Sequence, residues 1–120
     1  MKIYIILTLY FSFMFPAFAS DIDNKGLECI YNMDNKRPNE YYWFSEEQVY
    51  KVWYDKNKSI IRKSTYPAYY KQTEEYIRFF RIFVLLNTLE FTDKHGNILG
   101  TCAFIRNYEN IEEIIKNRLN

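Results

Sequence analysis

Two cysteines near opposite ends of the sequence place the strongest constraint on the fold. Cys29 and Cys102 are the only cysteines in the 120 residues, so a single intramolecular disulfide is possible. The ring that it closes holds about 74 residues, and a chain-entropy model gives it a stabilisation of roughly 4 kcal/mol. Two buried free thiols, or a zinc site with His95, are the alternatives. Structural zinc has four ligands and only these three residues have suitable chemistry, so we favour the disulfide.

The N-terminal segment has the pattern of a secretory signal peptide. Lys2 is the only charged residue before Asp21, and the residues between them are apolar or hydroxyl-bearing up to an alanine-containing end at Ala19. We therefore predict a signal peptide over 1–19 and a single small domain over 20–120. The exported chain would be periplasmic or extracellular, where a disulfide persists. The alternative is an uncleaved segment that tethers the protein to a membrane as an accessory subunit.

The charge of the chain limits the choice of partner. Removal of Lys2 leaves 15 of the 16 basic residues against 15 acidic ones, so the predicted mature chain is formally neutral. A neutral chain offers little long-range attraction to a polyanion, which argues against nucleic acid as a partner. Contact with a membrane is expected only through the N-terminal segment, if that segment is not cleaved.

Alternation of apolar and polar residues predicts a mainly β domain. The polar residues 55–58 predict one hairpin, and residues 93–97, which include Gly96, predict another. A disulfide would bring the first and last strands together, because bridged Cα atoms lie about 4.4–6.8 Å apart. We therefore expect a small antiparallel sheet, sandwich or barrel-like. Its strands are predicted over residues 27–32, 41–44, 47–54, 59–65, 66–71, 75–80, 83–91 and 98–105.

Two segments in the middle and one at the start need separate interpretation. For residues 73–86, β-branched and aromatic content favours two strands, but no Gly or Pro marks a turn near Arg81, so a capped helix is the alternative. From residue 83 to 91 alternate positions are largely apolar, which predicts one continuous strand. Residues 21–25 are mostly polar and are expected to be frayed.

The C-terminal segment changes to helical spacing. Its isoleucines and Leu119 recur every three or four residues, which predicts a short helix over about 111–118. Asn110 is placed to cap this helix, with Glu113 completing a capping box. So short a helix is marginal alone, so its apolar stripe must dock on the sheet. The predicted fold class is thus mainly β (α+β), with one short C-terminal helix.

The sequence contains little that indicates catalysis. His95 is the only histidine and lies in a predicted turn, where exposure to solvent is the usual state. No nucleophile elbow, zinc-protease helix, phosphate loop or calcium loop occurs. We predict no catalytic, cofactor-binding or metal-binding residue and expect a protein that is not an enzyme. A small secreted enzyme is the least favoured alternative.

Aromatic residues supply the one functional indication. Tyr and Trp offer much contact area at low entropic cost, so exposed ones recur at binding surfaces. Core packing, and a composition rich in residues with AT-rich codons, explain the same residues without a function. We predict a non-catalytic binding or envelope accessory module, whose partner is a protein, a glycan or an apolar ligand. The candidate surface is Tyr41, Tyr42, Trp43, Trp53, Tyr54, Tyr66, Tyr69 and Tyr70.

The order of these features resembles that of many small exported bacterial proteins. A leader, an early cysteine, a β-rich body and a late hairpin that carries the second cysteine follow one another. This outline is similar to that of periplasmic lysozyme inhibitors, which are small disulfide-linked barrels. No inhibitor motif matches these residues, so no residue role is transferred.

Overall fold

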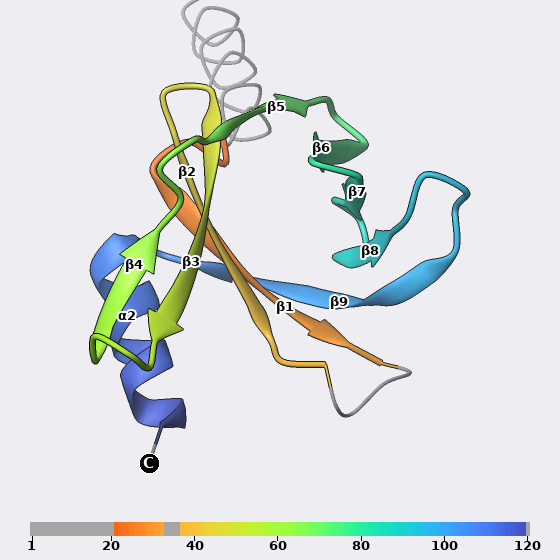
Figure 1. Cartoon of the computed structure of the whole chain (residues 1–120). Coiled ribbons are helices and arrows are strands. Elements are labelled where there is room, and N and C mark those ends of the chain that lie inside the picture. The colour runs from red at the N-terminus through yellow and green to blue at the C-terminus, as the bar shows by residue number, and fades with distance from the viewer. Residues whose placement is uncertain (1–20, 33–36, 120) are drawn as a thin grey trace, which may run out of the picture.

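The computed structural model describes residues 21–32 and 37–119 (Figure 1). The predicted signal peptide and its cleavage site lie outside these residues. The fold is mainly β with one short C-terminal helix, as the sequence predicts. The elements of the described residues are β1 (Lys25–Tyr31), β2 (Glu40–Ser45), β3 (Gln48–Asp55), β4 (Ile60–Lys63), β5 (Ala68–Gln72), β6 (Tyr76–Phe79), β7 (Ile82–Leu85), β8 (Glu90–Thr92), β9 (Ile98–Ile105) and α2 (Tyr108–Arg118).

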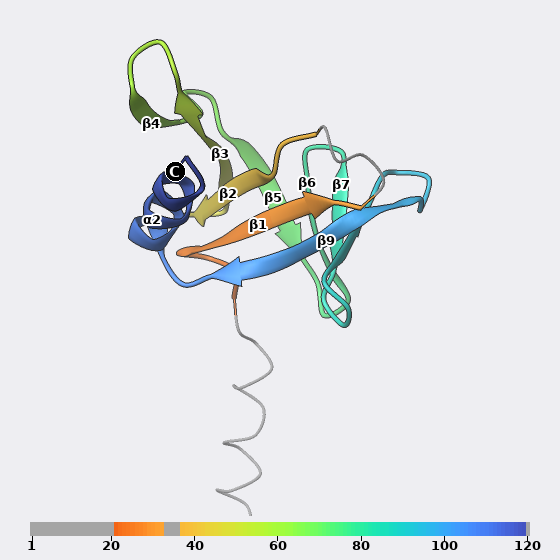
Figure 2. The same cartoon turned by 90° about the horizontal axis from the view of Figure 1, so that it is seen from below.

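Eight of the described strands close into an antiparallel barrel. They pair in the order β1–β2–β3–β5–β6–β7–β8–β9, and β9 returns to pair with β1. Figure 2 shows β1 and β9 running side by side. The remaining strand, β4, pairs with the end of β3 that extends past β5. Closure pairs the strands of the ring on both edges, which protects them from edge-to-edge association.

The disulfide fixes the point where the barrel closes. Cys29 in β1 lies directly opposite Cys102 in β9, and their sulfur atoms are bonded, with the Cα atoms 4.0 Å apart. The predicted disulfide is therefore confirmed. Both sulfurs are used in this bond, so the alternatives of free thiols and of a zinc site with His95 are excluded.

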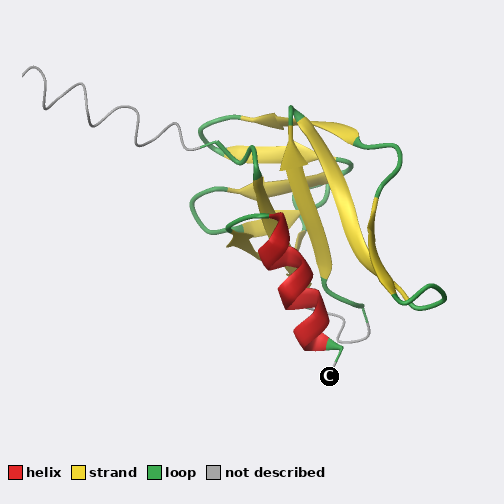
Figure 3. Cartoon of the chain, turned by 90° about the vertical axis from the view of Figure 1, so that its left-hand side faces the viewer, coloured by secondary structure: helices red, strands yellow, loops and turns green. Residues whose placement is uncertain are grey.

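The apolar core has two parts, one inside the barrel and one beneath the helix. Phe44, Phe79 and Phe91 are fully buried in the interior part, where edge-to-face contacts join Phe44 to Phe79. In the second part, Ile111 and Ile115 of α2 pack on the outer side of the sheet. Figure 3 shows the helix lying against the strands.

A glycine and an ion pair allow the helix to lie close to β1. A Cβ atom at Gly26 would be 2.5 Å from Cδ1 of Ile111, so only glycine permits this approach. At the other end of the helix, Nε of Arg118 lies 2.9 Å from Oε2 of the buried Glu28. The hydroxyl of Tyr41 donates to the same carboxylate oxygen at 2.8 Å. The helix is thereby held to the barrel by apolar and charged contacts together.

The helix begins earlier than the sequence predicts. Asn107, not Asn110, is the N-cap: its side-chain oxygen accepts a hydrogen bond of 2.9 Å from the backbone N–H of Asn110. Asn107 has the extended backbone that an N-cap requires, whereas Asn110 already lies in the first turn. The prediction of Asn110 as the cap is wrong because two asparagines three residues apart compete for the same role.

Two further local predictions are wrong. Residues 21–25 are not frayed, because Ile22 is fully buried in the barrel and its N–H donates to the side chain of Gln72 at 3.0 Å. The predicted strand 83–91 is divided into β7 and β8. At the division, the N–H of Leu89 donates to the carbonyl of Leu85 at 2.7 Å, and Leu89 has a positive φ of 62°. Its apolar side chain continues the alternation through a turn.

Candidate functional site

The turn between β6 and β7 is the centre of the candidate site. Phe79 pairs with Ile82, which leaves Phe80 and Arg81 as a two-residue turn. Residues 73–86 thus form two strands and a turn, not the alternative helix. Phe80 has a φ of 50°, in the left-handed region that costs a residue with a Cβ atom roughly 1–2 kcal/mol. Despite its size, Phe80 is also 49% exposed.

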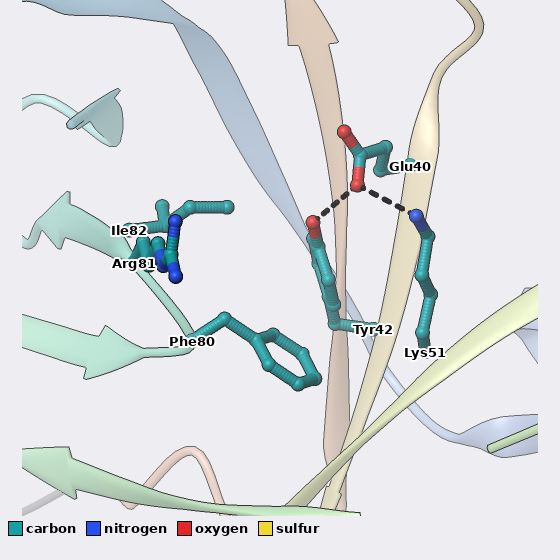
Figure 4. Close-up of a pocket in the computed structure, with 6 residues that line it drawn as sticks. All are labelled: Glu40, Tyr42, Lys51, Phe80, Arg81 and Ile82. Carbon is teal, nitrogen blue, oxygen red and sulfur yellow. Dashed lines mark hydrogen bonds and ion pairs between the residues drawn. The ribbon is translucent and has the colours of Figure 1, made fainter.

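A pocket of about 460 Å³ lies on one side of this turn (Figure 4). Phe80, Arg81 and Ile82 form one wall. Glu40 and Tyr42 of β2 and Lys51 of β3 form the other. The Phe80 and Tyr42 rings are tilted toward each other with centroids 6.2 Å apart. The volume is within the range of small-molecule sites, roughly 300–1,000 Å³.

The carboxylate of Glu40 in this pocket is held by several neighbours. Oε2 of Glu40 accepts a hydrogen bond of 2.6 Å from the hydroxyl of Tyr42 and lies 3.2 Å from Nζ of Lys51. Oε1 accepts a hydrogen bond from the hydroxyl of Tyr31. The guanidinium of Arg37 stacks on the Tyr31 ring at 3.9 Å. One cation and two phenols therefore contact the carboxylate, and a second cation, Arg37, stacks on one of these phenols.

These contacts shift the protonation equilibria of the pocket in opposite directions. Burial alone raises the pKa of Glu40, but the hydrogen bonds from Tyr31 and Tyr42 and the charge of Lys51 outweigh it, and the pKa is lowered. Burial, followed by the hydrogen bond to Glu40, raises the pKa of Tyr31 to about 12. The same causes raise the pKa of Tyr42. At neutral pH the Glu40 cluster thus holds a carboxylate and two neutral phenols, one of which, Tyr42, lines the pocket.

A second hollow, of about 400 Å³, lies on the other side of the turn, over β5, β6 and β7. Phe80 and Arg81 line both hollows. The second one has four cationic side chains and no carboxylate among the residues that line it. The four cations are Lys71, Arg78, Arg81 and Lys94.

The eight aromatic residues of the predicted surface fall into two groups. Five are packed: Tyr41, Tyr42 and Tyr54 lie in the two cores, Trp43 contacts the Tyr108 ring, and Tyr70 contacts the Phe44 ring. Three are exposed, namely Trp53 (40%), Tyr66 (89%) and Tyr69 (76%). Tyr42 lines the first pocket, whereas Tyr69 and Tyr70 line the second hollow. Binding by these eight residues remains a prediction, and three of them are exposed.

Several residues of the two hollows carry no signal in the sequence. Phe80 and Arg81 lack the Gly, Asn or Pro that would mark a turn. Glu40 and Lys51 are eleven positions apart, and only the pairing of β2 with β3 brings them together. His95 is exposed at a hairpin tip, where its backbone N–H donates to Asp93 at 2.8 Å.

Comparison with protein-family models, curated proteins and solved structures gives no match for this chain. Within residues 21–32 and 37–119, no helix has the length and apolar character needed to span a membrane. In the same part of the chain, no three His, Cys, Asp or Glu side chains are grouped so that they could hold a metal ion.

Proposed function

We propose that this chain is a small, exported, non-catalytic binding module that binds its partner at the Phe80–Arg81 turn. The observation that carries the proposal is the state of Phe80, which is bulky, half-exposed and strained, and stands between two hollows. Strained residues are retained where the surroundings over-determine them, and they cluster at ligand-binding sites. A glycine at position 80 would remove the strain but also the aromatic contact surface.

The proposal of binding without catalysis is supported by the protonation states in the first pocket. A general acid or base works best with a pKa near the operating pH. Here the pKa of Glu40 is lowered and the pKa of Tyr31 is raised, so both move away from neutrality. Glu40 also has three partners already. These groups are arranged to fix the shape and polarity of the pocket.

The partner is expected to insert an apolar group between Tyr42 and Phe80. Tyr42 is buried and held by Glu40, so it supplies a rigid floor. Phe80 supplies a half-exposed wall on the opposite side. Central aromatic anchors surrounded by polar groups are typical of the residues that dominate binding energy.

Replacement of Phe80 by glycine tests the proposal. Phe80→Gly relieves the left-handed strain and loses partial packing, so we expect its free energy of unfolding to stay within about 1 kcal/mol of wild type. Immobilised wild type, incubated with envelope extract from the source cells, should retain at least one partner that Phe80→Gly does not. The readout is quantitative mass spectrometry of the retained proteins and glycans.

The matched control is Ser59→Gly. Ser59 is exposed in the β3–β4 turn and also has a positive φ, 55°, but it lines neither hollow. This variant should keep the full set of retained partners. Identical retention by wild type, Phe80→Gly and Ser59→Gly would contradict the proposed function.

Export is the second part of the proposal. A disulfide that closes the barrel is consistent with an oxidising compartment, and the N-terminal pattern is typical of a cleaved leader. N-terminal sequencing of the secreted protein should begin at Ser20. Exported protein that starts at Met1 would instead support the tethered accessory subunit.

A further inference from the structure

The four cations of the second hollow have no ion-pair partner in the part of the chain that the structure describes. Lys51, Arg62 and Arg118 each lie within 3.2 Å of a carboxylate oxygen. In the described part of the chain, none of the four cations of the hollow has a carboxylate within ion-pair distance. The hollow is therefore a patch of uncompensated positive charge on a chain whose formal net charge is only +1.

Two of these cations are placed where they repel each other. Lys71 in β5 is the direct cross-strand partner of Arg78 in β6, and both side chains are exposed. Like charges directly opposite each other on neighbouring strands destabilise a sheet. Figure 2 shows these strands next to each other in one wall of the barrel. A negative charge brought between the two side chains would remove the repulsion.

The hollow also has aromatic walls. Phe80 and Phe83 line it beside Arg78 and Arg81, and Tyr69, which is 76% exposed, stands at the same hollow. A ligand that satisfies this surface needs carboxylates for the cations and apolar groups for the rings. The planar guanidinium groups of the two arginines suit carboxylates, which they bind with two parallel hydrogen bonds.

We propose that this hollow binds an acidic segment of a partner protein, one in which Asp or Glu side chains alternate with apolar ones. The inference rests on the proposed function, and it names the class of partner that the Phe80–Arg81 turn recognises. A polypeptide offers carboxylates and apolar side chains on one chain. A chain with a formal net charge of only +1 offers little long-range attraction to a longer polyanion such as nucleic acid.

The test uses a synthetic peptide of alternating Glu and Phe residues with a fluorescent label. Its affinity for the purified full domain is measured by fluorescence anisotropy at low and high salt. Lys71→Glu converts the repulsive pair with Arg78 into an attractive one. We expect this variant to bind the peptide about tenfold or more weakly, and to have a higher Tm than wild type.

Lys56→Glu is the control, because it makes the same charge change in the exposed β3–β4 turn, outside both hollows. It should bind the peptide as wild type does. A loss of affinity equal to that of Lys71→Glu would show that net charge alone governs binding and would overturn the inference.

Competing probes separate the other classes of anion. A sulfated polysaccharide, a single-stranded oligonucleotide and vesicles containing phosphatidylglycerol are added in turn to the labelled complex. Tighter binding of any of these, with the same sensitivity to Lys71→Glu, would overturn the choice of an acidic protein. Absence of peptide binding would also overturn it, but would leave the retention experiment with Phe80→Gly unaffected, so the two proposals fail separately.

Discussion

The wall of the barrel formed by β1, β2 and β9 differs from the wall formed by β5, β6 and β7 in what covers its outer side. On the first wall, α2 buries Ile111 and Ile115, and Glu28 has both Arg118 and Tyr41 as partners. On the second wall, Lys71 and Arg78 are exposed and face each other without a carboxylate. On the first wall the helix forms a second layer and the charge of Glu28 is compensated, whereas the second wall has one layer and its Lys71 and Arg78 have no carboxylate partner among the described residues.

This difference separates the residues that stabilise the protein from those available for binding. Relief of strain or charge repulsion is a common way to stabilise a protein, and its recurrent cost is function at the site that is relieved. Phe80 and the Lys71–Arg78 pair both belong to the exposed wall. Substitutions on the covered wall should therefore reduce stability and leave binding intact. Substitutions on the exposed wall should weaken binding and leave stability unchanged or raise it.

The largest effect is expected from loss of the disulfide. The double variant Cys29→Ser with Cys102→Ser opens a ring whose ends are 73 positions apart, and the free energy of unfolding should fall by about 4 kcal/mol. Urea denaturation with and without reductant measures this. Reductant should lower the stability of wild type but not that of the double variant. A decrease below about 1 kcal/mol would show that β1 and β9 are held mainly by their other contacts.

The next effect is expected beneath the helix. Ile111→Ala removes a fully buried side chain and leaves a cavity next to Gly26, so the free energy of unfolding should fall by about 3 kcal/mol. Leu119→Ala, at a half-exposed position just after the helix, is the control and should cost far less. The acidic peptide should bind both variants as it binds wild type. Weaker binding to Ile111→Ala would mean that the two walls are coupled.

Glu40 in β2 lines the pocket that faces the Phe80–Arg81 turn, and its effect on stability should depend on pH. Glu40→Gln weakens charge-assisted contacts with Tyr31, Tyr42 and Lys51, and should cost about 1–3 kcal/mol at neutral pH. Because the folded state lowers the pKa of Glu40, its contribution is present above the ordinary value of 4.5. It is lost as the pH falls through the folded pKa.

Urea denaturation of wild type and Glu40→Gln across acid and neutral pH measures this dependence. The stability difference between the two proteins should shrink as the pH falls below 4.5, the ordinary pKa of glutamate. A difference that does not change with pH would mean that the carboxylate charge is not what stabilises this cluster. Loss of peptide binding is not expected, since Glu40 does not line the second hollow.

The covered wall was the easier one to predict from the sequence. The cysteines have one possible partner each, and the isoleucines of the helix recur at helical spacing, so the disulfide and the docking of the helix follow from counting and periodicity. The first residue of the helix does not follow from this periodicity. Asn107 and Asn110 are equivalent as caps in sequence terms, and only the extended backbone of Asn107 distinguishes them.

The exposed wall could not be predicted because its features depend on pairing between strands. The repulsion between Lys71 and Arg78 exists only in the observed register, which a sequence pattern does not specify. Two of the described turns also lack, at their position of positive φ, the residues that usually mark a turn. Phe80 and Leu89 both adopt positive φ without being Gly or Asn. The alternation of apolar residues therefore continues through the turn at Leu89. For this reason the sequence predicts one strand over 83–91, where the structure has two, β7 and β8.

The smallest effects on stability are expected from two tyrosines of the predicted aromatic surface, one packed and one exposed. Tyr41→Phe removes the hydroxyl that donates to the buried Glu28 at 2.8 Å, so we expect a loss of about 1 kcal/mol in unfolding free energy with unchanged peptide binding. Tyr69→Ser changes an exposed side chain, so its stability should stay within about 0.5 kcal/mol of wild type.

Because Tyr69 lines the second hollow, Tyr69→Ser should nevertheless weaken peptide binding. Urea denaturation and fluorescence anisotropy on the same two variants give both quantities. If neither variant changed the affinity for the peptide, the exposed ring of Tyr69 would have no part in recognition, and the cations of the hollow would bind the peptide without it. If Tyr69→Ser weakens binding while Tyr41→Phe does not, the division of the aromatic cluster follows the division between the two walls, because the fold covers Tyr41 and leaves Tyr69 exposed.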